Sequence, residues 1–237
     1  LVLSSISSDY KVLVVCNGDI FKPDDNSFIE GDNSLWEFSG WRKGFDTLKS
    51  RYGLTYEDTF VFCNDTFKSH RKFNFIDRLF FSHSVKKQMK TTHPFLVGDF
   101  QKSKKCFSLF GHEFDTWFSS YLFATDYYVA SLLHPFHYSE ESLDELIISV
   151  DNSRIIFNKQ VSAQLSEHLN SWLYPKFNSH GWYNRTASLD LKAMKTKAIL
   201  NEKRLITLVS SLRDAKVVNF YSGFGAFYKR LKIKFGF

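Results

Sequence analysis

Short apolar runs and helical patterns alternate along the chain. Residues 11–15, Lys-Val-Leu-Val-Val, form a β-branched run that predicts a buried parallel strand. Proline, glycine, aspartate and asparagine then crowd residues 22–35, which predicts a loop. Apolar side chains recur at helical spacing over residues 36–52, and Gly53 supplies a helix stop. With the apolar run at residues 60–63 as the next strand, this order is typical of a βαβ unit.

The rest of the chain continues the alternation. Residues 95–98 predict a short strand that ends at Asp99, and residues 119–124 predict another, followed by a helix that begins at Asp126. The strongest helical pattern spans residues 193–212. Weaker patterns predict a basic helix at 76–89, helical structure over 140–172, a loop over 173–188 and a last strand at 216–221. The whole pattern predicts an α/β fold.

Length and composition indicate one domain over residues 1–237. Of the 237 residues, 43% are hydrophobic and 18% are aromatic, so we expect a sizeable, aromatic-rich core. No apolar run reaches the ~18 residues of a membrane-spanning helix. The three cysteines are widely spaced, and Cys16 and Cys63 lie in apolar strands. We therefore expect buried thiols in a reducing, cytoplasmic setting.

Positive charge predominates, with a formal net charge of +6 and a pI near 9.1. A basic chain favours anionic partners. The sequence contains no recognised RNA- or DNA-binding signature, so we predict no nucleic-acid partner. Residues 222–237 form a tail that interleaves aromatic residues with lysines. This tail either lies on an anionic membrane surface or packs as a last strand or helix with solvated lysines.

Candidate chemistry lies around the strand at residues 60–63, which is followed by Asn64 and Asp65. Open α/β sheets bind ligands at the carboxyl ends of their strands, and hard oxygen ligands there suit a nucleotide and a divalent cation. An Asn-Asp-Thr sequence is also an ordinary turn. The acidic, aromatic and glycine-rich helix start at residues 37–44 shifts the balance toward a functional site.

These segments resemble the GT-A class of glycosyltransferases, and within it the rhamnan-synthesis F type of bacterial surface-polysaccharide transferases. That family has Asp-Phe, two residues that are each Gly or Ala, and then Trp, and this chain has Glu-Phe-Ser-Gly-Trp at residues 37–41. The family's Asn-Asp-Thr after an apolar strand corresponds to residues 64–66, and its Gln-Ser-Tyr strand to residues 119–121. Glu202 matches the glutamate of a helix near the end of the family's domain.

The chain also departs from the family pattern. Glu37 replaces an aspartate, Ser119 replaces a glutamine, and residues 68–70 replace a Gly-Pro pair. Residues 12–15 correspond to the family's second strand, so we expect the first strand to be missing. The resemblance implies a GT-A-like, Rossmann-like domain with a mostly parallel sheet flanked by helices.

For function, the resemblance implies transfer of a sugar from a nucleotide-sugar donor to a carbohydrate or lipid-linked glycan acceptor. The product would be a bacterial capsule or O-antigen polysaccharide, made in the cytoplasm or at the inner face of the cytoplasmic membrane. The alternative is a non-catalytic carbohydrate- or nucleotide-binding module of a larger synthase. Such a module would keep the fold without turning over a donor.

The donor pocket has six candidate residues, which share positions at strand ends or at the start of the helix: Asn17, Asp19, Glu37, Trp41, Asn64 and Asp65. Asp65 is the candidate contact for the diphosphate or for a Mn²⁺ or Mg²⁺ ion, because the charge of the leaving diphosphate must be stabilised. A single carboxylate is a poor metal cage, so metal dependence stays open. Trp41 is equally expected to be a core residue.

An inverting transfer also needs a carboxylate that takes the proton from the acceptor hydroxyl. Three residues are candidates for this general base. Asp99 follows a short strand, Asp115 precedes an aromatic strand, and Glu202 matches the family's glutamate. Glu202 also lies mid-helix among charged residues, where pairing between neighbouring turns is common.

Overall fold

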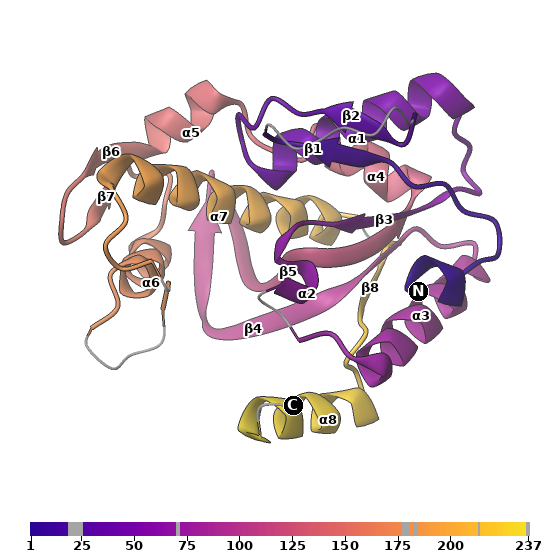
Figure 1. Ribbon diagram of the computed structural model, residues 1–237. Coiled ribbons are helices and arrows are strands. Elements are labelled where there is room, and N and C mark those ends of the chain that lie inside the picture. The colour runs from indigo at the N-terminus through magenta and orange to yellow at the C-terminus, as the bar shows by residue number, and fades with distance from the viewer. Residues whose placement is uncertain (19–25, 70–71, 177–180, 183, 213, 236–237) are drawn as a thin grey trace.

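A computed structural model shows a mixed sheet with helices on both faces (Figure 1). It describes residues 1–18, 26–69, 72–176, 181–182, 184–212 and 214–235. The main sheet has the strand order β3 (Thr59–Cys63), β5 (His112–Asp126), β4 (Phe95–Leu109) and β8 (Lys216–Asn219). β3 and β4 run antiparallel to β5, and only β8 runs parallel to its neighbour β4. The α/β class is confirmed, but the prediction of a mostly parallel sheet is wrong.

The antiparallel arrangement follows from a tight turn between β4 and β5. Phe110 and Gly111 both have positive φ angles, of 51° and 77°. A turn of two residues can join only antiparallel strands, because a parallel pair needs a long crossover. The short strands predicted at 95–98 and 119–124 are thus parts of two 15-residue strands.

A separate parallel pair, β1 (Val14–Cys16) and β2 (Phe28–Glu30), lies beside the main sheet. β2 falls within the segment predicted as loop. β1 was predicted to be a buried strand, but only Cys16 is buried, and Val14 is 36% exposed. The prediction of two buried thiols holds for Cys16 but is wrong for Cys63, the last residue of β3, which is exposed.

Two glycines let the first helix, α1 (Glu37–Tyr52), approach β1 closely. A Cβ atom on Gly44 would lie 3.3 Å from a methyl group of Val15, and one on Gly40 would lie 3.7 Å from the other. A Cβ atom at Gly44 would be tight against Val15, which would have to shift slightly, whereas a Cβ atom at Gly40 would make an ordinary van der Waals contact. The helix ends as predicted at Gly53, which has a φ angle of 58°.

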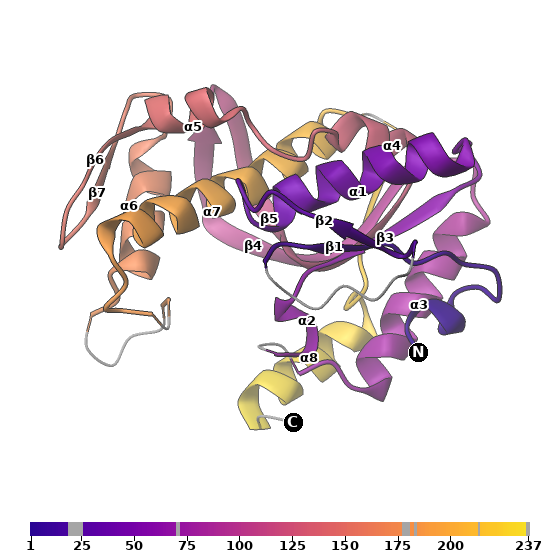
Figure 2. The same ribbon diagram turned by 45° about the horizontal axis from the view of Figure 1, so that its top comes forward.

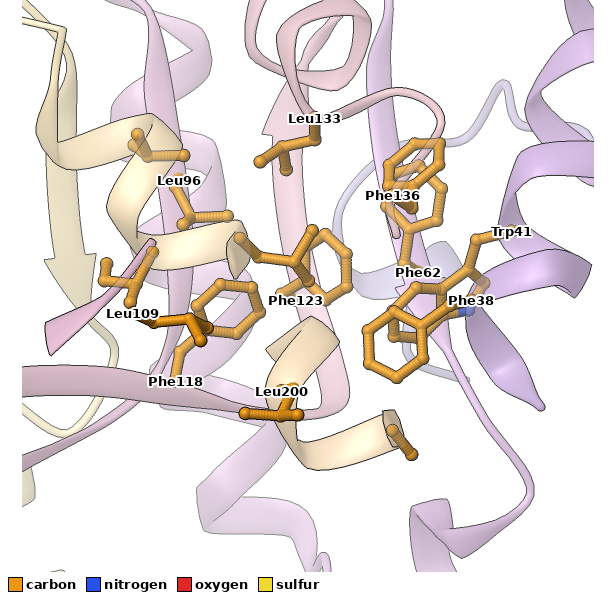
Figure 3. Close-up of a cluster of buried hydrophobic side chains, with 14 of the residues drawn as sticks. Phe38, Trp41, Phe62, Leu96, Leu109, Phe118, Phe123, Leu133, Phe136 and Leu200 are labelled. Carbon is orange, nitrogen blue, oxygen red and sulfur yellow. The ribbon is translucent and has the colours of Figure 1, made fainter. Parts of the chain in front are cut away.

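The side chains of the main sheet alternate between two cores. Phe62, Leu96 and Phe123 pack with α1, α4 (Tyr127–Leu133) and α7 (Leu189–Ser210), as Figure 3 shows for part of this cluster. Val97 and Ala124, one position away, pack with α3 (Phe75–Met89) and α8 (Phe224–Phe235). Figure 2 shows the two groups of helices on opposite sides of the sheet. This alternation is the period of two that strand geometry requires.

The predicted helices are confirmed with small shifts. α3 begins one residue before the predicted 76–89, α4 begins after Asp126, and α7 begins four residues before the predicted 193. Asp126 caps α4 by accepting a hydrogen bond from the Val129 N–H at 2.7 Å. The basic tail forms α8, and no described helix is long and apolar enough to cross a membrane.

The helical structure predicted over 140–172 is interrupted. Two helices, α5 (Glu140–Leu146) and α6 (Ala163–Leu173), are separated by a hairpin of β6 (Ile147–Val150) and β7 (Ile155–Phe157). Two short elements complete the described chain: η1 (Leu3–Ser5) at the N-terminus and α2 (Thr66–Ser69) directly after β3.

Candidate functional site

Glu37 lies where α1, β3 and β5 meet. Its Oε1 atom accepts hydrogen bonds from Asn64 Nδ2 and from Ser120 Oγ, each at 3.2 Å. Glu37 is the first residue of α1, Asn64 follows β3 directly, and Ser120 lies in the second half of β5. Three segments that are distant in sequence therefore contribute polar side chains to one point at the carboxyl end of β3.

Glu202 of α7 brings a second carboxylate to this point. The Ser120 N–H donates to Glu202 Oε1 at 2.8 Å, and the Glu202 side chain remains 20% exposed. Ser120 thus bridges the two acids, with its hydroxyl bonded to Glu37 and its backbone amide bonded to Glu202. We call Glu37, Asn64, Ser120 and Glu202 the carboxylate cluster.

Burial raises the pKa of Glu37 above its ordinary value of 4.5, and the negative charge of Glu202 adds to this effect. Its backbone hydrogen bond, the charge of Lys195 and the hydroxyl of Ser120 act in the opposite direction. Lys195 precedes Glu202 by two helical turns on α7, so both side chains lie on the same face. The site therefore combines two carboxylates with the cation of Lys195, and Glu202 also pairs with the neighbouring Lys203 at 3.8 Å.

Trp36 connects the cluster to Lys195 and to Asn17. Lys195 Nζ lies 4.7 Å from the centre of the Trp36 ring, a cation–π distance. Trp36 itself has a φ angle of 55°, which is uncommon for a large side chain and costs ~1–3 kcal/mol. Asn17 Nδ2 and Ser39 Oγ both hydrogen-bond to the Trp36 carbonyl at 3.2 Å and hold it in this conformation. Strained residues of this kind cluster at functional sites.

Asn17 therefore lies next to the site, but its side chain hydrogen-bonds to the backbone of Trp36, directly before α1. Its side chain packs directly on Gly31, where a Cβ atom would lie only 1.7 Å from Asn17 Oδ1. That oxygen is buried and has no hydrogen-bond partner among the described residues. Asp19, the other candidate after β1, lies outside the described residues.

Of the two roles predicted for Trp41, in the donor pocket or in the core, the structure shows the core role. It is 7% exposed and its ring packs edge-on against Phe38 and Phe123, at centroid distances of 5.0 and 5.2 Å (Figure 3). Its indole N–H donates to the Cys63 carbonyl at 3.3 Å. Trp41 thus ties α1 to the last residue of β3, which holds Glu37 and Asn64 at the same end of the sheet.

The Asn-Asp-Thr segment forms the expected turn, and Asn64 also contacts Glu37, while its predicted role in ligand binding stays a prediction. Asn64 Oδ1 accepts from the Thr66 N–H at 3.1 Å, which is the ordinary turn interaction, while Asn64 Nδ2 reaches Glu37. Asp65 is exposed at this edge. Among the described residues, no group of three or more His, Cys, Asp or Glu side chains could hold a metal ion.

The residues present thus do not form a protein cage for Mn²⁺ or Mg²⁺. Asp65 could contribute one carboxylate, and such ions are often held by one or two carboxylates plus substrate phosphates. Metal dependence therefore stays a prediction, and no chemical step below depends on the ion.

The other two candidates for the general base lie apart from the cluster. Asp99 is 2% exposed, pairs with Lys229 of α8 and accepts a hydrogen bond from the Tyr121 hydroxyl at 3.4 Å. It is therefore a buried partner of α8. Asp115 is exposed near the start of β5, where it pairs with Lys102 at 3.3 Å and bonds Thr116. These two hydrogen bonds lower its pKa.

Sequence reasoning missed three residues of the site. Ser120 and Lys195 lie inside segments that resemble family motifs, but nothing in the pattern separates them from their neighbours. Trp36 directly precedes the Glu37 motif, and only its backbone conformation marks it. Comparison of the chain with protein-family models, with curated proteins and with solved structures gives no match.

Proposed function

We propose that this chain is a glycosyltransferase that moves a sugar from a nucleotide-sugar donor to a carbohydrate hydroxyl. The acceptor would belong to a bacterial cell-surface polysaccharide, a capsule or an O-antigen, assembled on the cytoplasmic side of the membrane. The observation that supports this proposal is the carboxylate cluster. Its members come from four segments that resemble successive GT-A motifs, and they meet at the carboxyl end of β3.

Within the cluster, we assign the general base to Glu202. Its Oε1 atom is oriented by the Ser120 amide, while Oε2 lies 3.8 Å from the Nζ atom of Lys203 and belongs to a partly exposed side chain. That carboxylate would take the proton of the acceptor hydroxyl as the hydroxyl oxygen attacks the sugar carbon and the nucleotide diphosphate leaves. This assignment favours inversion at that carbon.

Glu37 is a positioning residue in this proposal. It receives hydrogen bonds from Asn64 and Ser120, so it fixes the strand end and the amide that orients Glu202. The donor diphosphate would lie toward Lys195 and Asp65, where the cation offsets the negative charge that develops on the leaving group. A divalent cation held by Asp65 and the phosphates would add to this stabilisation when bound.

The first test is a thermal-shift screen with UDP, GDP, CMP and dTDP, each with and without Mn²⁺, on the wild type and Asp65→Ala. A bound nucleotide at a hundredfold excess over Kd should stabilise the fold by ~2.7 kcal/mol. We expect one nucleotide to give this shift, and Asp65→Ala to weaken it. If no nucleotide stabilises the folded wild type, the proposed donor site is wrong.

The second test measures sugar release from the matching donor with Glu202→Gln and with the exposed Glu57→Gln as the matched control. Loss of a general base should lower turnover at least ~100-fold while nucleotide binding persists. The control should match the wild type. Nucleotide binding without turnover in the wild type would favour the alternative of a non-catalytic module. Full turnover in Glu202→Gln would show that Glu202 is not the general base.

A further inference from the structure

α8 exposes three large apolar side chains to solvent, at different positions around the helix. Phe224, Phe227 and Ile233 are 75%, 56% and 75% exposed. The helix packs on the protein through the buried residues Gly225 and Tyr228. A surface helix normally turns its apolar face inward and its charged face outward. The large exposed apolar side chains of α8 therefore need a partner outside the described chain.

The neighbouring helix α3 adds a second exposed apolar group. Phe75, Ile76 and Leu79 in its first two turns are 60%, 42% and 48% exposed. The two helices are in contact, because the Phe80 ring lies 5.7 Å from that of Tyr228. Figures 1 and 2 both show α3 and α8 on the same side of the sheet. We call the exposed residues of the two helices the α3–α8 surface.

The charge of the α3–α8 surface is positive. α8 contains no acidic residue, and α3 contains only Asp77. Asp77 is fully buried and pairs with Lys232, so it contributes no negative charge to the surface. Arg230 on α8 is exposed, and so are Lys86, Lys87 and Lys90 at and just after the carboxyl end of α3.

Two lysines of the tail do not belong to this surface. Lys229 pairs with Asp99 and Lys232 with Asp77, so both anchor α8 to the protein. The tail is a helix, as one interpretation predicted, but these two lysines are paired with buried acids and are not solvated. α8 is therefore a fixed helix whose other exposed side chains include apolar and cationic groups.

We propose that the α3–α8 surface binds the headgroup region of an anionic lipid bilayer. Aromatic and aliphatic side chains would enter the boundary between headgroups and acyl chains, and the cations would contact lipid phosphates. The absence of any free carboxylate on the two helices favours this partner over a protein surface of mixed charge. Membrane binding at this surface does not depend on the proposed reaction.

The test is sedimentation with vesicles of phosphatidylcholine alone and of phosphatidylcholine mixed with phosphatidylglycerol, without any nucleotide or sugar. We expect the whole chain to bind the anionic vesicles. Phe224→Ser/Phe227→Ser/Ile233→Ser should weaken binding at least ~tenfold, because three side chains lose apolar burial. Lys86→Gln/Lys87→Gln/Arg230→Gln should also weaken it by about tenfold or more, and added salt should do the same.

The matched control is Ile148→Ser, because Ile148 on β6 is 64% exposed and lies at the other end of the molecule (Figure 1). It should bind vesicles like the wild type. Circular dichroism melting would confirm that each variant is folded. Equal binding by the wild type and a folded apolar variant, or no binding to either vesicle, would overturn the proposal. Self-association that the apolar variant abolishes, without vesicle binding, would assign the surface to a second copy of the chain.

Discussion

Burial of Glu37 between Asn64 and Ser120 disfavours its charged form. Because its pKa is raised above 4.5 in the folded state, the native protein holds the proton more tightly than the unfolded chain. Stability should therefore fall as pH rises from about 4.5 through the raised pKa. Glu37→Gln removes this ionisation. We expect the variant to gain stability over the wild type as pH rises, in urea denaturation curves recorded across that range.

The control for this prediction is Glu57→Gln, which changes an exposed carboxylate. Its stability difference from the wild type should not vary with pH. A constant difference for Glu37→Gln as well would mean that the Glu37 carboxyl titrates normally, and would contradict the electrostatic description of the site. If Glu37→Gln also loses turnover, the carboxyl of Glu37 is needed for function although it lowers the stability of the folded protein, a compromise that is common in active sites.

At the residue scale, the sequence predicts the acidic residues of the site better than the hydrogen bonds that connect them. Glu37, Asn64 and Glu202 stand out because they are carboxylates and an amide at positions that resemble family motifs, although a turn also accounts for Asn64 and helix pairing for Glu202. Ser120 does not stand out, since a serine in a strand is ordinary. Its role comes from its place in the sheet, where its hydroxyl and amide face two different acids. Asp99 also stands out in the sequence, but the structure makes it a buried partner of α8. The local pattern could not predict this, because its partner Lys229 lies 130 residues away.

At the scale of elements, an ion pair with the buried Asp77 of α3 attaches α8 to the protein. Asp77 accepts hydrogen bonds from the Asn74 N–H and the Tyr221 hydroxyl, each at 2.7 Å, and it pairs with Lys232. Lys232→Met would leave Asp77 buried without its cation. We expect a loss of ~3–5 kcal/mol in the free energy of unfolding, measured by urea denaturation, with faster hydrogen exchange in α8.

Two variants sharpen this prediction. Lys232→Met/Asp77→Asn removes both charges and should recover part of the lost stability, because no unpaired charge remains. Arg230→Met removes an exposed cation of the same helix and should change stability by less than ~1 kcal/mol. A loss for Lys232→Met as small as that for Arg230→Met would show that the pair behaves like an ordinary surface ion pair.

The sequence predicts helices more completely than strands. α1, α3 and α7 carry a period near 3.6 residues and clear end signals, which are local properties of the chain. The distal half of the β4–β5 hairpin carries Lys102, Lys104 and Lys105 and lacks the apolar run that marks a strand. β2 is only three residues long and lies in a segment rich in turn residues. Strand direction is set by pairing, so the mixed sheet could not be read from local patterns.

At the scale of the whole molecule, one sheet supports two cores. Phe123 is fully buried on the face toward α1 and α7, where its ring stacks on Phe62 at 4.8 Å. Phe81 is fully buried on the other face, where its ring meets that of Phe220 at 5.4 Å. β5 contributes residues to both cores. The carboxylate cluster belongs to the first face, and α8, with the surface proposed to bind a membrane, belongs to the second.

Because the two cores share their strands, we expect them to unfold together. Phe123→Leu and Phe81→Leu should each lower the free energy of unfolding by ~1 kcal/mol, since leucine keeps most of the apolar volume. In the double variant the two losses should add to within ~0.5 kcal/mol, because the side chains lie on opposite faces without shared partners. Fluorescence and circular dichroism should follow one coincident transition in all three variants. Separate transitions, with Phe81→Leu shifting only one of them, would mean that α3 and α8 form a unit that can detach while the carboxylate cluster stays folded.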